Sequence, residues 1–121
     1  MARTLEAVPA SVASARRFAA EATAWLPAGL RDAVVLMVSE LATNCAVHAG
    51  GEFKISIERE ARFLRVEVAD RSPGEPVPKS PQLDDLHGRG LLIVEQLSDE
   101  WGVERRDGSK TVWFRLVLPA S

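Results

Sequence analysis

Residues 30–48 read LRDAVVLMVSELATNCAVH, and this stretch decides which fold we expect of the chain. Its apolar residues recur at the spacing of an α-helix, so a helical wheel gathers them on one face. That face contains Val34, Met37, Val38, Leu41 and Cys45. The sequence therefore predicts an amphipathic helix from Leu30 to about His48, packed on a core through this face.

Two polar residues interrupt the apolar face. Glu40 and Asn44 lie one helical turn apart inside it, and His48 continues their row at the next turn. Burying an unpaired carboxylate costs several kcal/mol or shifts its pKa, so Glu40 needs a partner or solvent. Two interpretations follow: a helix edge that reaches water, or one wall of a cleft that holds water, a metal or a polar ligand. The helix alone does not decide between them.

The segments around this helix predict further elements. Before it, we expect a short strand over residues 3–8 and a helix that begins at Pro9–Ser11. Apolar residues recur in that helix as far as Leu26, and Pro27 and Gly29 are expected to end it. After it, alternating apolar residues over 53–57 and 64–68 predict two antiparallel strands with a turn near Glu60-Ala61.

The second half of the chain predicts a loop, a helix and a hairpin. Arg71 to His87 carries four of the seven prolines and no periodicity, which is typical of a loop. A third helix is predicted from about Gly88, and strands over 101–106 and 110–118 flank a turn at Asp107-Gly108. These elements predict an α+β fold, a two-layer sandwich with helices on one face of a mainly antiparallel sheet.

The length and composition of the chain exclude several classes of protein. A chain of 121 residues predicts a single domain over 1–121. A net charge of −2 and scattered Lys and Arg argue against direct binding of nucleic acid. The single Cys45 cannot form an internal disulfide and is interpreted as a core residue. We find no membrane span or signal peptide in the sequence, so we expect a cytoplasmic protein.

Three further features carry chemistry. Asp70 ends the strand LRVEVAD, although an Asp there is commonly a turn former. Gly88-Arg89-Gly90 stands at a helix start, where free N–H groups favour an anion, but an ordinary capped helix is the more common explanation of a Gly-x-Gly alone. Thr111 lies in GSKTVWF (108–114), which lacks the GxxxxGK[ST] spacing of a P-loop and precedes a strand.

Taken in order, these features resemble the GHKL (histidine kinase-like) ATPases, most closely the small stand-alone anti-sigma-factor serine/threonine kinases and related bacterial ATP-binding regulators. The resemblance runs from about Val8 to Leu118 and implies the Bergerat-type ATP-binding fold. It rests on four segments, which correspond in order to the N box, the Asp-x-Gly-x-Gly box, the next Gly-rich box and the closing strand: ELATNCAVHA (40–49), VADRSPGEP (68–76), GRGLLIVEQLSDEWGV (88–103) and GSKTVWFRL (108–116).

The resemblance implies roles for individual residues. Asn44 would hold the Mg²⁺ that bridges the phosphates of ATP, and Glu40 would act as general base toward the attacking hydroxyl. Asp70 would accept a hydrogen bond from the adenine amino group, and Thr111 would hydrogen-bond in the adenine pocket. A lid loop over about 71–87 and the helix start that follows would close on the nucleotide through Gly74, Gly88, Arg89 and Gly90.

One position departs from the family pattern. Ser72 replaces the first glycine of the Asp-x-Gly-x-Gly box, where backbone normally approaches the nucleotide. The resemblance thus implies a Mg-ATP-dependent anti-sigma factor that phosphorylates a serine of its antagonist. Its partners would be a sigma factor and that antagonist, and it allows a homodimer. The alternative is a docking module that binds ATP without catalysis, or binds no nucleotide, and regulates a transcription partner.

Overall fold

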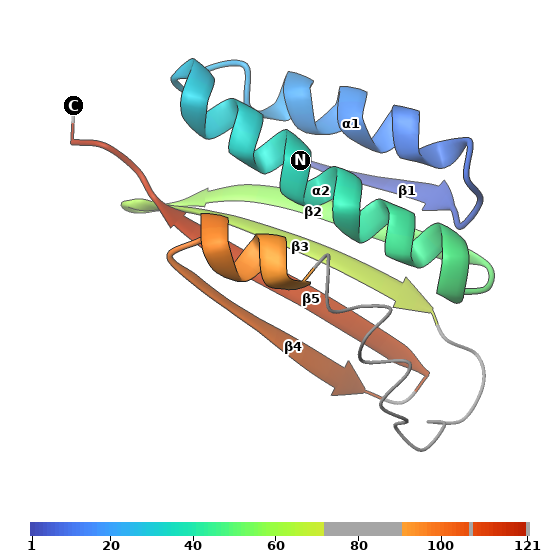
Figure 1. The fold of residues 1–121 in the computed structure, drawn as a ribbon. Coiled ribbons are helices and arrows are strands. Elements are labelled where there is room, and N and C mark those ends of the chain that lie inside the picture. Colours follow the sequence, from blue (N-terminus) through green and yellow to red (C-terminus); the bar gives the residue numbers. More distant parts are fainter. Residues whose placement is uncertain (72–90, 107, 121) are drawn as a thin grey trace.

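A computed structural model describes residues 1–71, 91–106 and 108–120 of the chain. Its elements in chain order are β1 (Ala2–Glu6), α1 (Ser11–Ala22), α2 (Ala28–His48), β2 (Glu52–Glu60), β3 (Phe63–Arg71), β4 (Glu100–Arg106) and β5 (Ser109–Val117) (Figure 1). A further helix over residues 91–97, drawn in orange and without a label, precedes β4.

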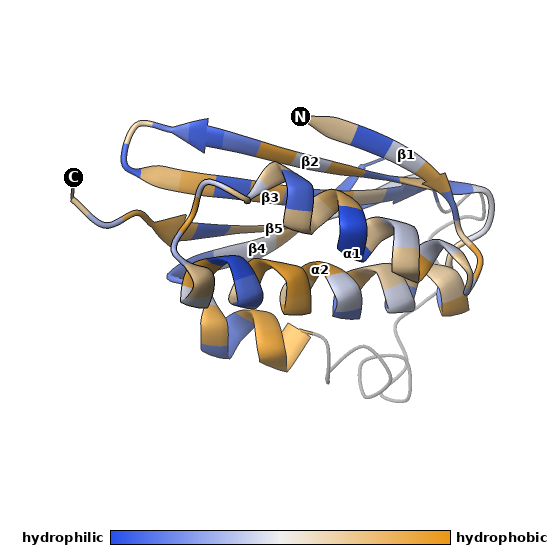
Figure 2. Cartoon of the chain, turned by 90° about the horizontal axis from the view of Figure 1, so that it is seen from above, coloured by the Kyte–Doolittle hydropathy of each residue, from blue (hydrophilic) through white to orange (hydrophobic). Residues whose placement is uncertain are grey.

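The five strands form one antiparallel sheet in the order β1-β2-β3-β5-β4. α1, α2 and the helix over 91–97 cover one face of it, and the view from above shows these helices on the same side of the sheet (Figure 2). The predicted α+β sandwich, with helices on one face of an antiparallel sheet, is confirmed.

The core lies between these two layers. Successive side chains of a strand point to opposite faces of the sheet, so every second side chain faces the helices. Phe18 of α1 and Met37 and Val38 of α2 are fully buried, as are Phe53 of β2 and Phe114 of β5. All five belong to one continuous apolar cluster. Burying a side chain of this size stabilises the folded chain by roughly 1.5–3 kcal/mol, so this cluster fixes α2 on the sheet.

Helix α1 ends one turn earlier than the sequence predicts. It stops at Ala22, and residues 23–26 form a turn in which the Leu26 amide donates to the Thr23 carbonyl at 2.9 Å. Buried Thr23 donates its own hydroxyl to the Ala19 carbonyl at 2.6 Å. Thr side chains compete in this way with helical hydrogen bonds, and Leu26 still reaches the core from the turn.

The outer face of the sheet carries its own packing. Trp113 of β5 pairs with Gly102 of β4, and an ideal Cβ on Gly102 would lie 2.8 Å from three atoms of the indole ring. The guanidinium of Arg65 in β3 stacks on the same ring, with its Cζ 4.6 Å from the ring centroid. Only glycine leaves room for Trp113 to lie flat across β4.

The turn between β2 and β3 lies where the sequence predicts it. The β2–β3 turn contains Ala61, whose φ of 51° lies in the left-handed region. Gly108 precedes β5 with a φ of 71°, while Asp107 lies outside the described residues. Within the described part of the chain, none of the helices is both long enough and apolar enough to span a bilayer.

Candidate functional site

On helix α2, the row formed by Glu40, Asn44 and His48 lies between the buried face and a more open side of the helix. Leu41 and Cys45 are buried, Glu40 and Asn44 are half-buried, and His48 is exposed at the end of the helix. The polar residues therefore lie at the border of the apolar face. A side chain in this position can reach a ligand without complete loss of hydration.

A row of charged side chains crosses the sheet under the last turns of α2. The strand register places Asp70 of β3 opposite Lys110 of β5, and Lys110 opposite Arg105 of β4. Neighbours across paired strands point to the same face, so all three side chains share the face that carries Val68 and Val112. Asp70 is 6% exposed, Lys110 is half-buried and Arg105 is exposed. The row thus runs from a buried anion to an open cation.

Asp70 contacts α2 through Cys45. The Cys45 Sγ lies 3.9 Å from Asp70 Oδ2 and donates a weak hydrogen bond to it. Burial raises the pKa of the Cys45 thiol from 9.0 to about 12, the negative charge of Asp70 adds to the rise, and the positive charge of Lys110 opposes it. The thiol is therefore a neutral core group and a poor nucleophile at physiological pH.

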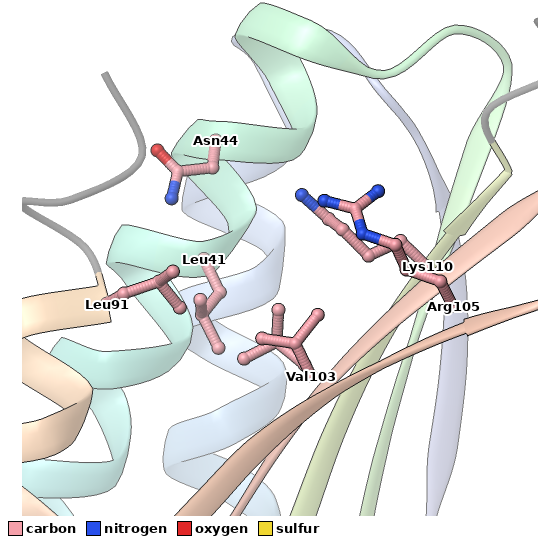
Figure 3. Close-up of a pocket in the computed structure, with 7 residues that line it drawn as sticks. Leu41, Asn44, Leu91, Val103, Arg105 and Lys110 are labelled. Atoms are coloured by element: carbon pink, nitrogen blue, oxygen red, sulfur yellow. The ribbon is translucent and has the colours of Figure 1, made fainter. Parts of the chain in front are cut away.

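A pocket of about 210 Å³ opens between α2, the helix over 91–97 and the β4–β5 hairpin. Its apolar lining comes from Leu41, Leu91, Val103 and Val112, and its polar lining from Asn44, Arg105 and Lys110. Figure 3 shows Arg105 and Lys110 extending together from the strands toward α2, with Asn44 projecting from α2 on the Leu91 side. Such a lining suits a ligand that has both an apolar ring and an anionic group.

The predicted site residues differ in where the structure places them. Asn44 lines the pocket, and Glu40 lies one turn earlier on α2 without lining it. Asp70 lies in the same sheet row as the lining residue Lys110. The rest lie beyond the residues that the structure describes: Gly74, Gly88, Arg89, Gly90 and, apart from Arg71, the lid over 71–87.

Thr111 faces away from this row. It pairs with Ala69 of β3 and Glu104 of β4, and it alternates with Lys110 and Val112, which point to the helices. Its side chain therefore lies on the outer face of the sheet, opposite to that of Asp70. The expected contact of Thr111 with adenine does not fit this register, and Lys110 takes the inward position.

Sequence reasoning missed Lys110 and Arg105. A signal for Lys110 was present, because it precedes Val112 and Phe114 with the same period of two that the inward apolar residues follow. Arg105 follows Trp101 and Val103 with the same period. The pairing of these two cations depends on the hairpin register, which the sequence does not state.

Comparison with known proteins identifies the family. The sequence model of the histidine kinase-like ATPase domain matches residues 5–116. The chain belongs to this family. Membership implies ATP binding, and the match covers every element from α1 to β4 and most of β5. The curated proteins contain no match to the chain.

Solved structures share the fold of this histidine kinase-like domain. The RsbU and RsbW domains of Rv1364c from Mycobacterium tuberculosis align with 98% of the chain at a TM-score of 0.75 and 19% identity. The histidine kinase AdeS from Acinetobacter baumannii aligns with 74% of it at a TM-score of 0.58 and 16% identity. The alignments span 32% and 48% of those two longer chains.

The residues present fit a nucleotide and its metal. Mg²⁺ prefers oxygen ligands and keeps several waters and phosphate oxygens, so a single amide oxygen such as that of Asn44 is a sufficient protein contribution. Among the residues that the structure describes, no three His, Cys, Asp or Glu side chains gather as a metal centre. The buried carboxylate of Asp70 is an acceptor that suits the amino group of adenine.

Proposed function

We propose that this histidine kinase-like domain binds Mg-ATP in the pocket and acts as an anti-sigma factor that phosphorylates a serine of its antagonist. The observation that carries the proposal is the position of Asn44, which lines a pocket one turn after Glu40 on the same helix. Membership of the histidine kinase-like ATPase family supports ATP as the ligand. The RsbW domain named in the similar structure supports the regulatory class by likeness of fold.

Each residue has a distinct part in this proposal. Asn44 holds the metal, and Asp70 selects the base as a buried hydrogen-bond acceptor. Glu40 takes the proton from the attacking serine hydroxyl, which suits a half-buried carboxylate. Gly74, Gly88, Arg89 and Gly90 are proposed to close on the nucleotide. Bound Mg-ATP supplies the phosphoryl group, and the protein contributes positioning and charge neutralisation.

A docking module is the second candidate, and two observations favour it. Glu40 does not line the pocket, and Ser72 replaces a glycine at a position where the family brings backbone close to the nucleotide. In this form the domain binds nucleotide, or none, and regulates a transcription partner by association alone. The two candidates differ in one measurable step, the covalent transfer of phosphate.

A transfer assay separates the candidates. The purified protein is incubated with labelled Mg-ATP and a small antagonist encoded by a neighbouring gene, and phosphoserine is measured. The kinase proposal predicts transfer by the wild type, loss in Glu40→Gln with ATP binding retained, and wild-type transfer in Glu21→Gln, which changes an exposed carboxylate on α1. ATP binding without transfer to the antagonist would leave the docking module, and absence of ATP binding would contradict both nucleotide-bound forms.

A further inference from the structure

Lys110 lies in the closing-strand segment 108–116, but the family resemblance implies no role for it or for Arg105. They belong to the β4–β5 hairpin, and both line the pocket together with Asn44. The strand register places Lys110 opposite Asp70, on the face of the sheet that packs against the helices. Lys110 has the carboxylate of Asp70 on one side and the guanidinium of Arg105 on the other, so the open end of the row carries an excess of positive charge that favours an anion.

The order of the charges along the sheet row predicts how a bound ligand would be oriented. Asp70, Lys110 and Arg105 occupy successive register positions on β3, β5 and β4. The anion is at the buried end and Arg105 is at the exposed end. A ligand bound along the row would place its hydrogen-bond donor near Asp70, its apolar ring against Leu41 and Val112, and its negative charge near the two cations.

We propose that Lys110 and Arg105 form the anion-binding wall of the pocket and contact the phosphate groups of the nucleotide directly. This inference rests on the proposed binding of ATP and adds residues from the sheet side to those from α2. The two cations are fixed parts of the protein, so they neutralise phosphate charge whether or not a metal is bound. They would therefore make nucleoside polyphosphates better ligands than the nucleoside.

Calorimetric titration of the full chain with ATP and with adenosine tests the wall. Charge-assisted hydrogen bonds stabilise a complex enough that Lys110→Gln and Arg105→Gln should each weaken ATP binding about tenfold while leaving adenosine binding unchanged. Arg106→Gln is the matched control, because it removes the same charge from the next residue of β4, which pairs with Ser109 on the outer face. It should bind ATP as the wild type does.

A second measurement needs no variant. With EDTA in place of Mg²⁺, the wild type should still bind ATP at least about tenfold more tightly than adenosine, because the two cations remain. Equal affinity for ATP and adenosine without metal would overturn the wall, as would wild-type ATP affinity in both glutamine variants or equal weakening of ATP and adenosine. A wild type that binds neither ligand would instead contradict the proposed function itself.

Discussion

Asn44 is exposed to two different environments because its helix face borders both the core and the pocket. Its neighbours Leu41 and Cys45 are buried, whereas Asn44 lines the pocket and is half-buried. An amide in this position keeps access to solvent and to a ligand without the desolvation cost that a fully buried polar group carries. The same position explains how an apolar helix face tolerates a polar residue.

Replacement of Asn44 should remove the metal-dependent part of ATP binding. Loss of an oxygen ligand from a charged centre is expected to weaken Mg-ATP binding in Asn44→Ala by at least about tenfold. Binding of ATP in EDTA should change little, because the metal is absent from both measurements. Thr43→Ala on the exposed side of α2 is the control. Equal losses with and without Mg²⁺ would contradict the metal assignment.

The Cys45 thiol gives the chain a specific dependence on alkaline pH. Its folded pKa is about 12, above the ordinary value of 9.0. Between these values the unfolded chain releases a proton that the folded chain retains, so the free energy of unfolding falls as pH rises above 9. The slope from this group is at most about 1.4 kcal/mol per pH unit.

Thiolate absorbance near 240 nm measures this titration directly. The chain has no tyrosine whose ionisation would overlap, so the signal reports Cys45 alone. We expect almost no thiolate in the folded protein at pH 10 and about nine-tenths ionisation at the same pH in denaturant. Cys45→Ala should show a shallower fall of stability above pH 9 than the wild type. A folded thiol that titrates near 9 would contradict the buried contact with Asp70.

At the scale of elements, periodicity predicts most of the structure. Helix α2 and strands β2 and β3 follow closely the apolar spacing of their sequences, because a buried face requires that spacing. The end of α1 does not follow it, since Thr23 bonds locally to Ala19 and Leu26 remains apolar and buried outside the helix. The spacing of apolar residues shows which residues are buried and not which are helical. A buried residue in a turn, such as Leu26, can therefore continue the apolar spacing of the helix before it.

The contact between Gly102 and Trp113 makes a prediction for the β4–β5 hairpin. Gly102→Ala places a methyl group 2.8 Å from the indole ring, and relief of that overlap requires the ring to leave Arg65 or the strands to separate. Overpacking of this kind costs about 1–3 kcal/mol. Denaturant unfolding should show that loss. Gly29→Ala in α2, which has nothing within 4 Å, should show none.

The whole molecule should respond to its ligand as one unit, because α2 and the β4–β5 hairpin both line the pocket. Saturation with Mg-ATP at one hundred times its dissociation constant should raise the free energy of unfolding by about 2.7 kcal/mol. GTP should raise it much less at the same concentration, since guanine presents an acceptor where adenine presents the amino donor to Asp70. Equal melting shifts with ATP and GTP would contradict the role of Asp70.

The sequence predicts the helix side of the site better than the sheet side. Asn44 is a polar residue on an apolar helix face, and this contrast is visible in one element. Lys110, by contrast, can be assigned to the pocket only when its register with Asp70 and Arg105 is known. Register joins residues 40 positions apart in the chain, such as 70 and 110, and local spacing carries no information about it. The outward direction of the Thr111 side chain likewise follows from the register and not from local spacing.

The strand order also determines where the protein can be attached to a surface. β1 and β4 form opposite edges of the sheet, four strand spacings or about 19 Å apart. A biotin or tether on the exposed side chains of β1 would hold the domain by the edge remote from Arg105. Immobilisation through β1 would therefore leave the pocket open to flowing ligand, whereas a tether on β4 would stand beside it.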